Sequence, residues 1–395
     1  MMHLRLLHLM DSSSGGDAAL LACAEACRIL GIEHRVWCLG SPALARHAMA
    51  LGLPVAASAT ATGPLETALR SLWRARQVTP AGQASPRAEP DAVIGWSPAS
   101  LHVATLAFAR SPDLPLIGVF SQAPTSAGSG WLGRRRLRRA AHRATVVPLG
   151  DCLARAWAAS LALSVTPLAP PVFTPSTDPA HRLARRAALG ILPHELAVLM
   201  LADPTRTGAF AGRDVRGFAQ VLGMAALTRA PLVGLAPRAA PGWERANRFC
   251  NATRRAWDII PFDGPVVAAL AAADLAVWAG APEADGPVLA IAAAAAGVPV
   301  LAVDSPATRE VLAPAASACL VRAPSVDTRL AGALLTLARD ATARRAAGIA
   351  LESHWLQPAR HWAFPAELLA VLRIATTVSR SSADWWKSLA GMPAA

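Results

Sequence analysis

The sequence predicts an α/β protein made of two Rossmann-like halves, each built on a parallel sheet, and three observations carry this prediction. Short apolar runs alternate with segments of helical periodicity from the N-terminus onward. The alternation restarts after a proline-rich stretch, "PLAPPVFTPSTDP", at residues 167–179. In the second half, "GPVLAIAAAAAGVPVLAVD", residues 286–304, combines a helix of small residues, a tight turn and a buried strand.

The first half opens with a predicted strand at His3–Met10, a polar loop over residues 11–17, a helix at Ala18–Leu30 and a strand at Glu33–Leu39. Such a strand–helix–strand unit requires parallel pairing through a right-handed crossover. Further strands are predicted in "DAVIGW", "PLIGVF" and "ATVVPLG", which suit burial on both faces. Residues 76–91, rich in proline, alanine and glycine, are expected to form a loop.

The second half repeats the pattern. Strands are predicted in "LAVLMLAD", "PLVGLAP", "VPVLAVD" and "ACLV" and at Leu275–Ala279, and a helix at Arg216–Arg229. Residues Asp327–Ala347 are predicted to be helical, with Ser325 or Asp327 as the N-cap.

We therefore expect an N-terminal Rossmann-like domain over residues 1–170, a second over residues 171–353, and a helical segment over residues 354–395. The proline-rich stretch fits a linker between the two domains. The tail contains "FPAELLAVLRIATT", an apolar helical pattern with no sheet of its own to cover. This segment is expected to cross back to the first domain.

Composition excludes several classes of protein. A hydrophobic fraction of 53% in 395 residues supports real cores, so global disorder is excluded. No apolar run is long enough to span a membrane, and the first one is too short for a signal peptide, so a cytoplasmic location is expected.

The net charge of +12 comes from arginine, because Lys387 is the only lysine. It is concentrated in "GRRRLRRAAHR", Gly133–Arg143. Arg134–Arg143 is either a solvated helix face or a surface for an anionic substrate or an anionic membrane, which would place the protein at the inner face of the membrane. No aromatic platform accompanies the patch, so nucleic acid is not expected.

The six cysteines are scattered, without a CxxC pair. Cys23 and Cys27 share a helix face at i,i+4 spacing, and a metal site there would need histidines or further cysteines nearby. The histidines form no recognised ligand motif. Buried free thiols and no metal are the expectation.

The ordered motifs resemble the GT-B glycosyltransferases, specifically the retaining, nucleotide-sugar-dependent family 4, over nearly the whole chain. "SSSGGDAALLACAEACRILGIEHRV" is similar to that family's Gly-Gly loop and first helix, and "PLAPPVFTP" to its hinge. "VVAALAAADLAVWAG" and "AIAAAAAGVPVLAVDSPATREVL" are similar to its donor-site strands and helices. The resemblance implies two Rossmann-like domains facing a central cleft.

The resemblance also implies a site for a nucleoside-diphosphate sugar. Gly15 and Gly16 are expected to offer backbone N–H groups at a helix N-terminus to the diphosphate, although an ordinary turn would look the same. Arg206 is the local replacement for the family's arginine and lysine, and it would otherwise be a surface arginine. Glu310, in "TREVL", joins the predicted binding residues. No cofactor is implied.

The family carries two glutamates in its donor-site helix region, where this chain has Ala284 and Ala292. Glu283 and Asp285 flank the first position and are the predicted catalytic residues, whereas nothing polar flanks the second. The histidine expected after "PLIGVF" is also replaced, by Ser121 or Gln122. Alanine has a structural interpretation as well, because it lets a helix approach a sheet closely at little cost in propensity.

Two functions from different classes therefore remain open. The first is a glycosyltransferase that transfers a sugar with retention to an unknown carbohydrate or lipid-linked acceptor. The second is a catalytically inactive GT-B module that binds a partner or carbohydrate as a scaffold. A sugar-nucleotide epimerase of the same fold is a weaker third interpretation.

Overall fold

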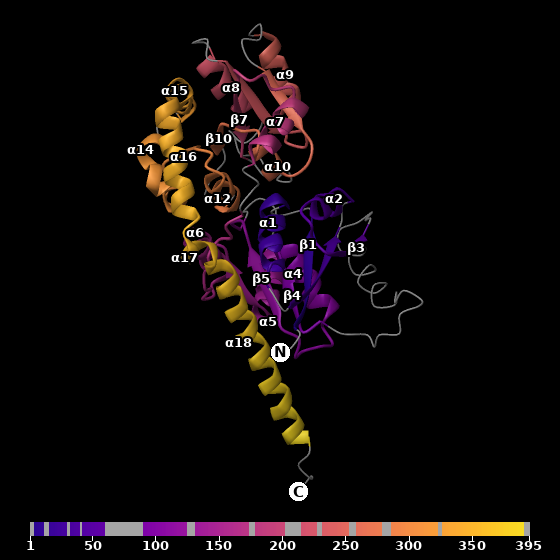
Figure 1. Cartoon of the computed structure of the whole chain (residues 1–395). Coiled ribbons are helices and arrows are strands. Elements are labelled where there is room, and N and C mark those ends of the chain that lie inside the picture. The colour runs from indigo at the N-terminus through magenta and orange to yellow at the C-terminus, as the bar shows by residue number, and fades with distance from the viewer. Residues whose placement is uncertain are drawn as a thin grey trace. The chain divides into compact units, whose positions relative to one another are not determined.

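The structure is a computed structural model, and it describes residues 4–11, 16–29, 32–39, 42–59, 90–124, 131–173, 178–201, 215–226, 231–252, 258–278, 286–322 and 326–390. The chain divides into two compact units (Figure 1). Unit 1 comprises the residues up to Ala169 together with the segment from Ala363 onward, and unit 2 runs from Pro170 to Trp362.

Unit 1 contains a six-stranded parallel sheet with the strand order β3-β2-β1-β4-β5-β6. The central strand β1 pairs with β2 on one side and with β4 on the other. Strands β4 and β5 are buried along their whole length, as expected for a sheet covered on both faces. The strands are β1 (Leu4–Asp11), β2 (Ile32–Leu39), β3 (Val55–Ala59), β4 (Ala92–Gly95), β5 (Leu116–Phe120) and β6 (Thr145–Pro148).

Helices connect the strands of unit 1, and the long C-terminal helix α18 contacts α1 within this unit. The carboxylate of Glu367 on α18 accepts a hydrogen bond of 2.7 Å from the backbone N–H of Ala169. Among the described helices, none combines the length and the apolar character needed to cross a membrane. The helices are α1 (Gly16–Cys27), α2 (Pro42–Ala50), α4 (Pro98–Ala107), α5 (Trp131–Arg143), α6 (Asp151–Leu161) and α18 (Ala363–Ala390).

Unit 2 contains a second six-stranded parallel sheet, with the order β12-β11-β10-β7-β8-β9. Counted within its own unit, this is the same order as in unit 1, because the first strand again lies between the second and the fourth. Both sheets therefore have the Rossmann arrangement, and they confirm the predicted fold class. The strands are β7 (Leu196–Met200), β8 (Leu232–Pro237), β9 (Asp258–Phe262), β10 (Leu275–Trp278), β11 (Val300–Val303) and β12 (Leu320–Val321).

The core of unit 2 is apolar side chains from the sheet and from helices such as α8 and α15, including the fully buried Phe218, Leu222 and Leu334. Figure 1 shows α15 and α16 side by side, and the two helices contact each other. The helices are α7 (Pro179–Ala188), α8 (Val215–Ala226), α9 (Trp243–Ala252), α10 (Val266–Leu270), α12 (Val288–Ala295), α13 (Pro306–Leu312), α14 (Ala316–Cys319), α15 (Val326–Arg339), α16 (Ala341–Trp355) and α17 (Pro358–His361), with a 3₁₀ turn at Ala313–Ala315.

The prediction that Asp327–Ala347 is helical is confirmed, but the structure has two helices there, and Asp340 separates α15 from α16. The Asp340 carboxylate accepts a hydrogen bond of 2.8 Å from the backbone N–H of Ala343, so it caps α16. Arg344 donates to the carbonyl oxygens of Leu337 and Ala338 at the end of α15. The apolar periodicity continues across Asp340, so the sequence pattern did not indicate the break.

Candidate functional site

Two of the six predicted site residues lie within the described part of the chain. Gly16 is the first residue of α1, and Glu310 is half-buried on α13. Gly15, Arg206, Glu283 and Asp285 lie outside the described residues. The structure therefore fixes the elements that lead into the predicted site, and the assignment of these six residues stays a prediction.

Ligands of open parallel sheets bind at the carboxyl ends of the strands, where the strand order reverses. In unit 1 this point lies between β1 and β4. Asp11 ends β1, and its carboxylate accepts a hydrogen bond from the Ser97 hydroxyl. Ser97 is also the N-cap of α4, since its hydroxyl oxygen accepts from the N–H of Ser100 at 2.9 Å. This polar edge was not predicted, although a serine followed by proline soon after an apolar run, as in "SPAS", is a signal for the start of a helix.

The N-terminus of α1 carries an acidic side chain. Asp17 lies in the first turn and is 3% exposed, and its carboxylate is 3.9 Å from the His47 imidazole. A carboxylate here interacts favourably with the positive end of the helix and offsets part of it. A diphosphate bound by the N–H groups near Gly16 would therefore need positive charge from another element.

In unit 2, the strand pair at the reversal point is β7 and β10. Arg206 follows β7 in the sequence, and Glu283 and Asp285 follow β10. All three predicted residues thus come after the carboxyl ends of the two strands where the fold places ligands. They lie outside the described residues.

Beside that pair, the carboxyl end of β11 carries a well-formed ion pair. Asp304 accepts two hydrogen bonds from the Arg309 guanidinium, at 2.6 and 2.8 Å. These bonds are the main reason that the pKa of Asp304 lies below its usual value, with the charges of Arg309 and Arg322 acting in the same direction. Ser305 caps α13, which carries Glu310 one residue after Arg309.

A cavity of about 860 Å³ opens at this place, and its lining includes Asp304 and the arginines Arg309, Arg322 and Arg329. It lies at the ends of β11 and β12, next to β10 but outside the β7–β10 pair. The three arginines of this cavity suit an anionic group. The cavity does not, however, lie at the point where the strand order of the sheet reverses.

The alanine-rich helix α12 is a packing element. Ala292, at one of the two positions where the family has a glutamate, is fully buried. Helix α12 contacts α16, and the close approach continues at the turn that follows α12. A Cβ atom on Gly348 would lie 2.3 Å from the carbonyl oxygen of Gly297. Gly297 itself has φ +70°, which favours glycine. Ala284 lies outside the described residues.

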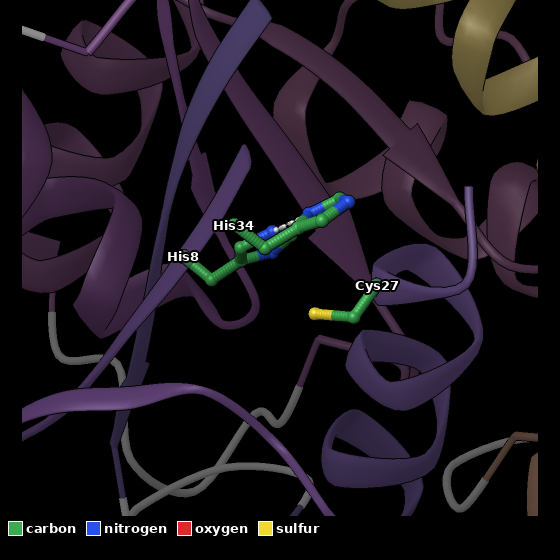
Figure 2. Close-up of side chains that lie close together, drawn as sticks. All are labelled: His8, Cys27 and His34. Carbon is green, nitrogen blue, oxygen red and sulfur yellow. Dashed lines mark hydrogen bonds between the residues drawn. The ribbon is translucent and has the colours of Figure 1, made fainter. Parts of the chain in front are cut away.

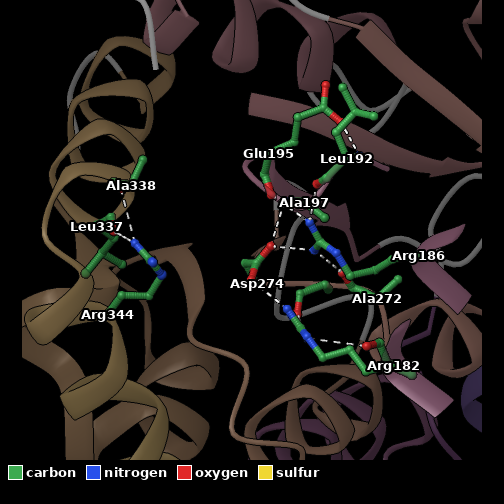
Figure 3. Close-up of polar contacts among 12 residues, drawn as sticks. Arg182, Arg186, Leu192, Glu195, Ala197, Ala272, Asp274, Leu337, Ala338 and Arg344 are labelled. Atoms are coloured by element: carbon green, nitrogen blue, oxygen red, sulfur yellow. Dashed lines mark hydrogen bonds and ion pairs between the residues drawn. The ribbon is translucent and has the colours of Figure 1, made fainter. Parts of the chain in front are cut away.

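The amino ends of β7 and β10 are tied together by an ionic cluster (Figure 3). The Asp274 carboxylate accepts from Arg182 at 2.6 Å, from Arg186 at 2.9 Å and from the N–H of Ala197 at 2.8 Å. Arg186 is 8% exposed, and its remaining terminal N–H groups donate to the backbone oxygens of Ala272, Leu192 and Glu195. The two strands that lead into the predicted donor loops are thereby fixed at their opposite ends.

The basic run Arg134–Arg143 falls on α5. Arg143 is not part of a free face, because its guanidinium donates to the backbone oxygens of Thr105, Phe108 and Ser111 at the end of α4. Arg135, Arg138 and Arg139 are exposed, whereas the side chains of Arg134 and Arg136 lie outside the description.

No protein-family model matches the sequence, and no curated protein is significantly similar to it. Solved structures do match its fold. HepE of Anabaena, solved with UDP and glucose, is 14% identical with a TM-score of 0.66, and the match covers 99% of this chain and 100% of HepE.

A glycosyltransferase from Rickettsia africae is 11% identical with a TM-score of 0.67, over 95% of this chain and 99% of that one. WaaG, a glycosyltransferase involved in lipopolysaccharide biosynthesis, is 16% identical with a TM-score of 0.59, over 93% and 99%. At these identities the likeness concerns the fold. The chain therefore has the GT-B fold, with two Rossmann-like units, that these glycosyltransferases share.

Proposed function

We propose that the protein is a glycosyltransferase that transfers a sugar, with retention, from a nucleoside-diphosphate donor to a carbohydrate or lipid-linked acceptor. One observation carries the proposal: the chain, both units included, matches two solved glycosyltransferases over 95% and 93% of its length and HepE, solved with UDP-glucose, over 97%. The family 4 assignment rests on the sequence motifs and is part of the same proposal.

The proposed roles follow from where charge develops. When the glycosidic bond to the diphosphate breaks, negative charge builds up on the leaving group, and a cation lowers the barrier. Arg206, which follows β7 in the sequence, would supply that cation, and backbone N–H groups near Gly15 and Gly16 would contribute. The Asp17 carboxylate would repel a negatively charged diphosphate near Gly16. The proposal therefore assigns more of the charge stabilisation to Arg206 than to the N–H groups near Gly16.

Glu283 and Asp285, which follow β10 in the sequence, would accept hydrogen bonds from the sugar hydroxyls, since carboxylates are strong acceptors. Glu310 would contribute to donor binding from α13. The buried Ala292 has no polar side-chain atom to hydrogen-bond the ribose hydroxyls, so other groups would have to bind them.

Titration calorimetry with uridine, guanosine and adenosine diphosphates tests this proposal. At least one nucleotide should bind the wild type, and Arg206→Ala should weaken binding by about 10- to 100-fold, the usual effect of losing a charge-assisted hydrogen bond. Arg345→Ala, an exposed arginine on α16, is the matched control and should bind normally.

If no nucleotide binds the wild type at millimolar concentration, the enzyme proposal fails and the inactive binding module stands. Equal binding by wild type and Arg206→Ala would show a real site but the wrong arginine.

We also propose peripheral contact with anionic lipid through the exposed arginines of α5, each contributing about 1 kcal/mol near such a surface. Flotation with vesicles containing phosphatidylserine should recover the protein at low salt and lose it at high salt. Absence of recovery at low salt would refute this contact.

A further inference from the structure

Unit 1 contains a cluster of imidazoles and thiols that the proposed function does not use (Figure 2). His8 comes from β1, His34 from the neighbouring strand β2, and Cys27 is the last residue of α1. One nitrogen of each imidazole and the Cys27 Sγ all lie within 4.8 Å of one another. Figure 2 shows the Cys27 sulfur pointing from α1 toward the two rings.

Hydrogen bonds fix the proton positions on the two imidazoles. The Trp96 indole can only donate, and its Nε1 lies 3.1 Å from His8 Nδ1, so His8 Nδ1 must be the acceptor. A neutral His8 then carries its proton on Nε2, which lies 3.0 Å from His34 Nδ1. His34 Nδ1 accepts this hydrogen bond, so a neutral His34 must hold its own proton on Nε2.

His34 Nε2 is the end of this chain. It is buried and has no hydrogen-bond partner among the residues that the structure describes. A buried N–H without an acceptor costs free energy, and an anionic acceptor would satisfy it best. The chain of donors thus runs from Trp96 through His8 to His34 and ends in the cluster that contains the Cys27 sulfur.

This direction of donation disfavours a metal ion. A metal ligand needs a free lone pair, but His8 Nε2 carries a proton as long as Trp96 donates to Nδ1. His34 could bind through Nε2 only as an anionic imidazolate, because its Nδ1 already accepts. A metal site at Cys23 and Cys27 was expected to need histidines nearby, and the fold does bring His8 and His34 close to Cys27. Their Nε2 atoms carry protons, however, which favours an anionic sulfur over a metal ion.

The groups around Cys27 also stabilise its anion. The neighbouring Cys23 thiol, and after it the His34 imidazole, lower the pKa of Cys27 to about 6, against the opposing effect of burial. Burial raises the pKa of Cys38, on β2, to about 11, so that this thiol stays protonated. The nearest charged residue along the chain, Arg28, is paired with Glu25 at 3.2 Å.

We propose that Cys27 is a reactive thiolate and the site at which electrophiles and hydroperoxides modify this protein. Cys27 is half-buried, so reagents can reach it, whereas Cys23 and Cys38 are buried. In the reaction with hydrogen peroxide, the thiolate sulfur attacks one oxygen and the O–O bond breaks. The sulfur is oxidised to a sulfenic acid, and the peroxide is reduced to hydroxide, which takes up a proton to form water.

Alkylation of the folded full-length chain by iodoacetamide, mapped by mass spectrometry, tests the site. The matched control is Cys152 on α6, which is also half-buried. At pH 6 Cys27 gains about 100-fold in thiolate fraction over an ordinary thiol and loses about tenfold in nucleophilicity, so it should react about tenfold faster than Cys152.

The pH profile of the Cys27 rate should have its midpoint near the pKa of about 6, and it should move upward in His34→Phe. If that variant does not fold, the wild-type profile alone decides, with the urea-unfolded chain as the reference. After treatment with hydrogen peroxide, dimedone should label Cys27.

Three results would overturn the proposal: a midpoint no lower than in the unfolded chain, a rate at pH 6 no higher than that of Cys152, or absence of dimedone labelling. Stoichiometric, submicromolar Zn²⁺ binding that blocks alkylation would also overturn it and establish a metal site. Nucleotide binding plays no part in these readouts, so the outcome is independent of the proposed function.

Discussion

Strands β1 and β4 of unit 1 and strands β7 and β10 of unit 2 are equivalent pairs, and their amino ends are built alike. Asp91 precedes β4 and accepts from the N–H of Arg5 at 2.9 Å; Asp274 precedes β10 and accepts from the N–H of Ala197 at 2.8 Å. In return, the N–H of each aspartate donates to the carbonyl oxygen of the same partner residue, at 2.8 Å in both units. The same sequence pattern, an aspartate before an apolar strand, thus gives the same reciprocal pair of hydrogen bonds in both units. We call each pair an aspartate clamp.

The surroundings of the two aspartates differ. Among the described residues, Asp91 forms an ion pair with the Arg5 guanidinium at 3.4 Å, and both side chains are partly exposed. Asp274 receives two arginines, and Arg186 is buried and bonded through all its terminal N–H groups. The amino ends of the strand pair are therefore held more strongly in unit 2 than in unit 1. In unit 2 the same two strands lead toward the predicted donor-site residues.

The two strand pairs also differ in the middle of their first strands, where unit 1 has the polar side chain and unit 2 an apolar one. The register of the clamps makes His8 on β1 equivalent to Met200 on β7, and both are fully buried. Unit 2 thus shows that this position of the fold requires only an apolar side chain. His8 is not needed for the architecture, which agrees with a chemical role for the cluster that it joins.

The first prediction contrasts the two clamps. Asp274→Ala should lower the free energy of unfolding by about 3–5 kcal/mol, because it leaves the buried Arg186 unpaired. Asp91→Ala should cost only about 1–2 kcal/mol, since it removes one backbone hydrogen bond and a partly exposed ion pair. Urea denaturation measures both. Equal losses in the two variants would mean that the cluster around Arg186 adds nothing to the clamp.

The second prediction uses His8→Met, which places in β1 the residue type that β7 carries. Burial and then the nearby His34 lower the pKa of His8 to about 3, whereas the imidazole of the unfolded chain has a pKa of about 6.5. Below pH 6.5 the unfolded state binds a proton that the folded state does not, so His8 makes stability fall as the pH falls toward 3.

Between pH 6 and 4 the wild type should therefore lose stability faster than His8→Met, by about 1.4 kcal/mol per pH unit, the value for one proton. Urea denaturation at several pH values gives the two slopes, and the carboxylates contribute equally to both proteins. Parallel slopes would show that His8 titrates normally in the folded protein.

Much of the fold could be predicted from the sequence, because the signals are local. Apolar runs such as "DAVIG" and "DLAVW", bounded by turns, predicted the buried strands, and the alternation with helices predicted parallel sheets. The break at Asp340 was missed because the apolar periodicity continues across it, while the cap depends on one side chain.

The candidate site was less predictable, since it depends on residues that are distant in sequence. Nothing in the spacing of Cys27, His34, His8 and Trp96 indicates that they meet; only the pairing of β1 with β2 and β4 brings them together. Likewise, the contact between Asp11, at the end of β1, and Ser97, the N-cap of α4, joins two residues that are 86 positions apart in the sequence.

The hydrogen-bond chain from Trp96 to His34 underlies the central contrast between the two strand pairs, and ¹⁵N NMR of the imidazole nitrogens measures it directly. Signals of His8 can be assigned by their loss in His8→Met. At pH 7.5 both His8 and His34 should be neutral and protonated on Nε2, with Nδ1 as the acceptor. A proton on Nδ1 of either ring, or a charged imidazolium at His34, would contradict the account.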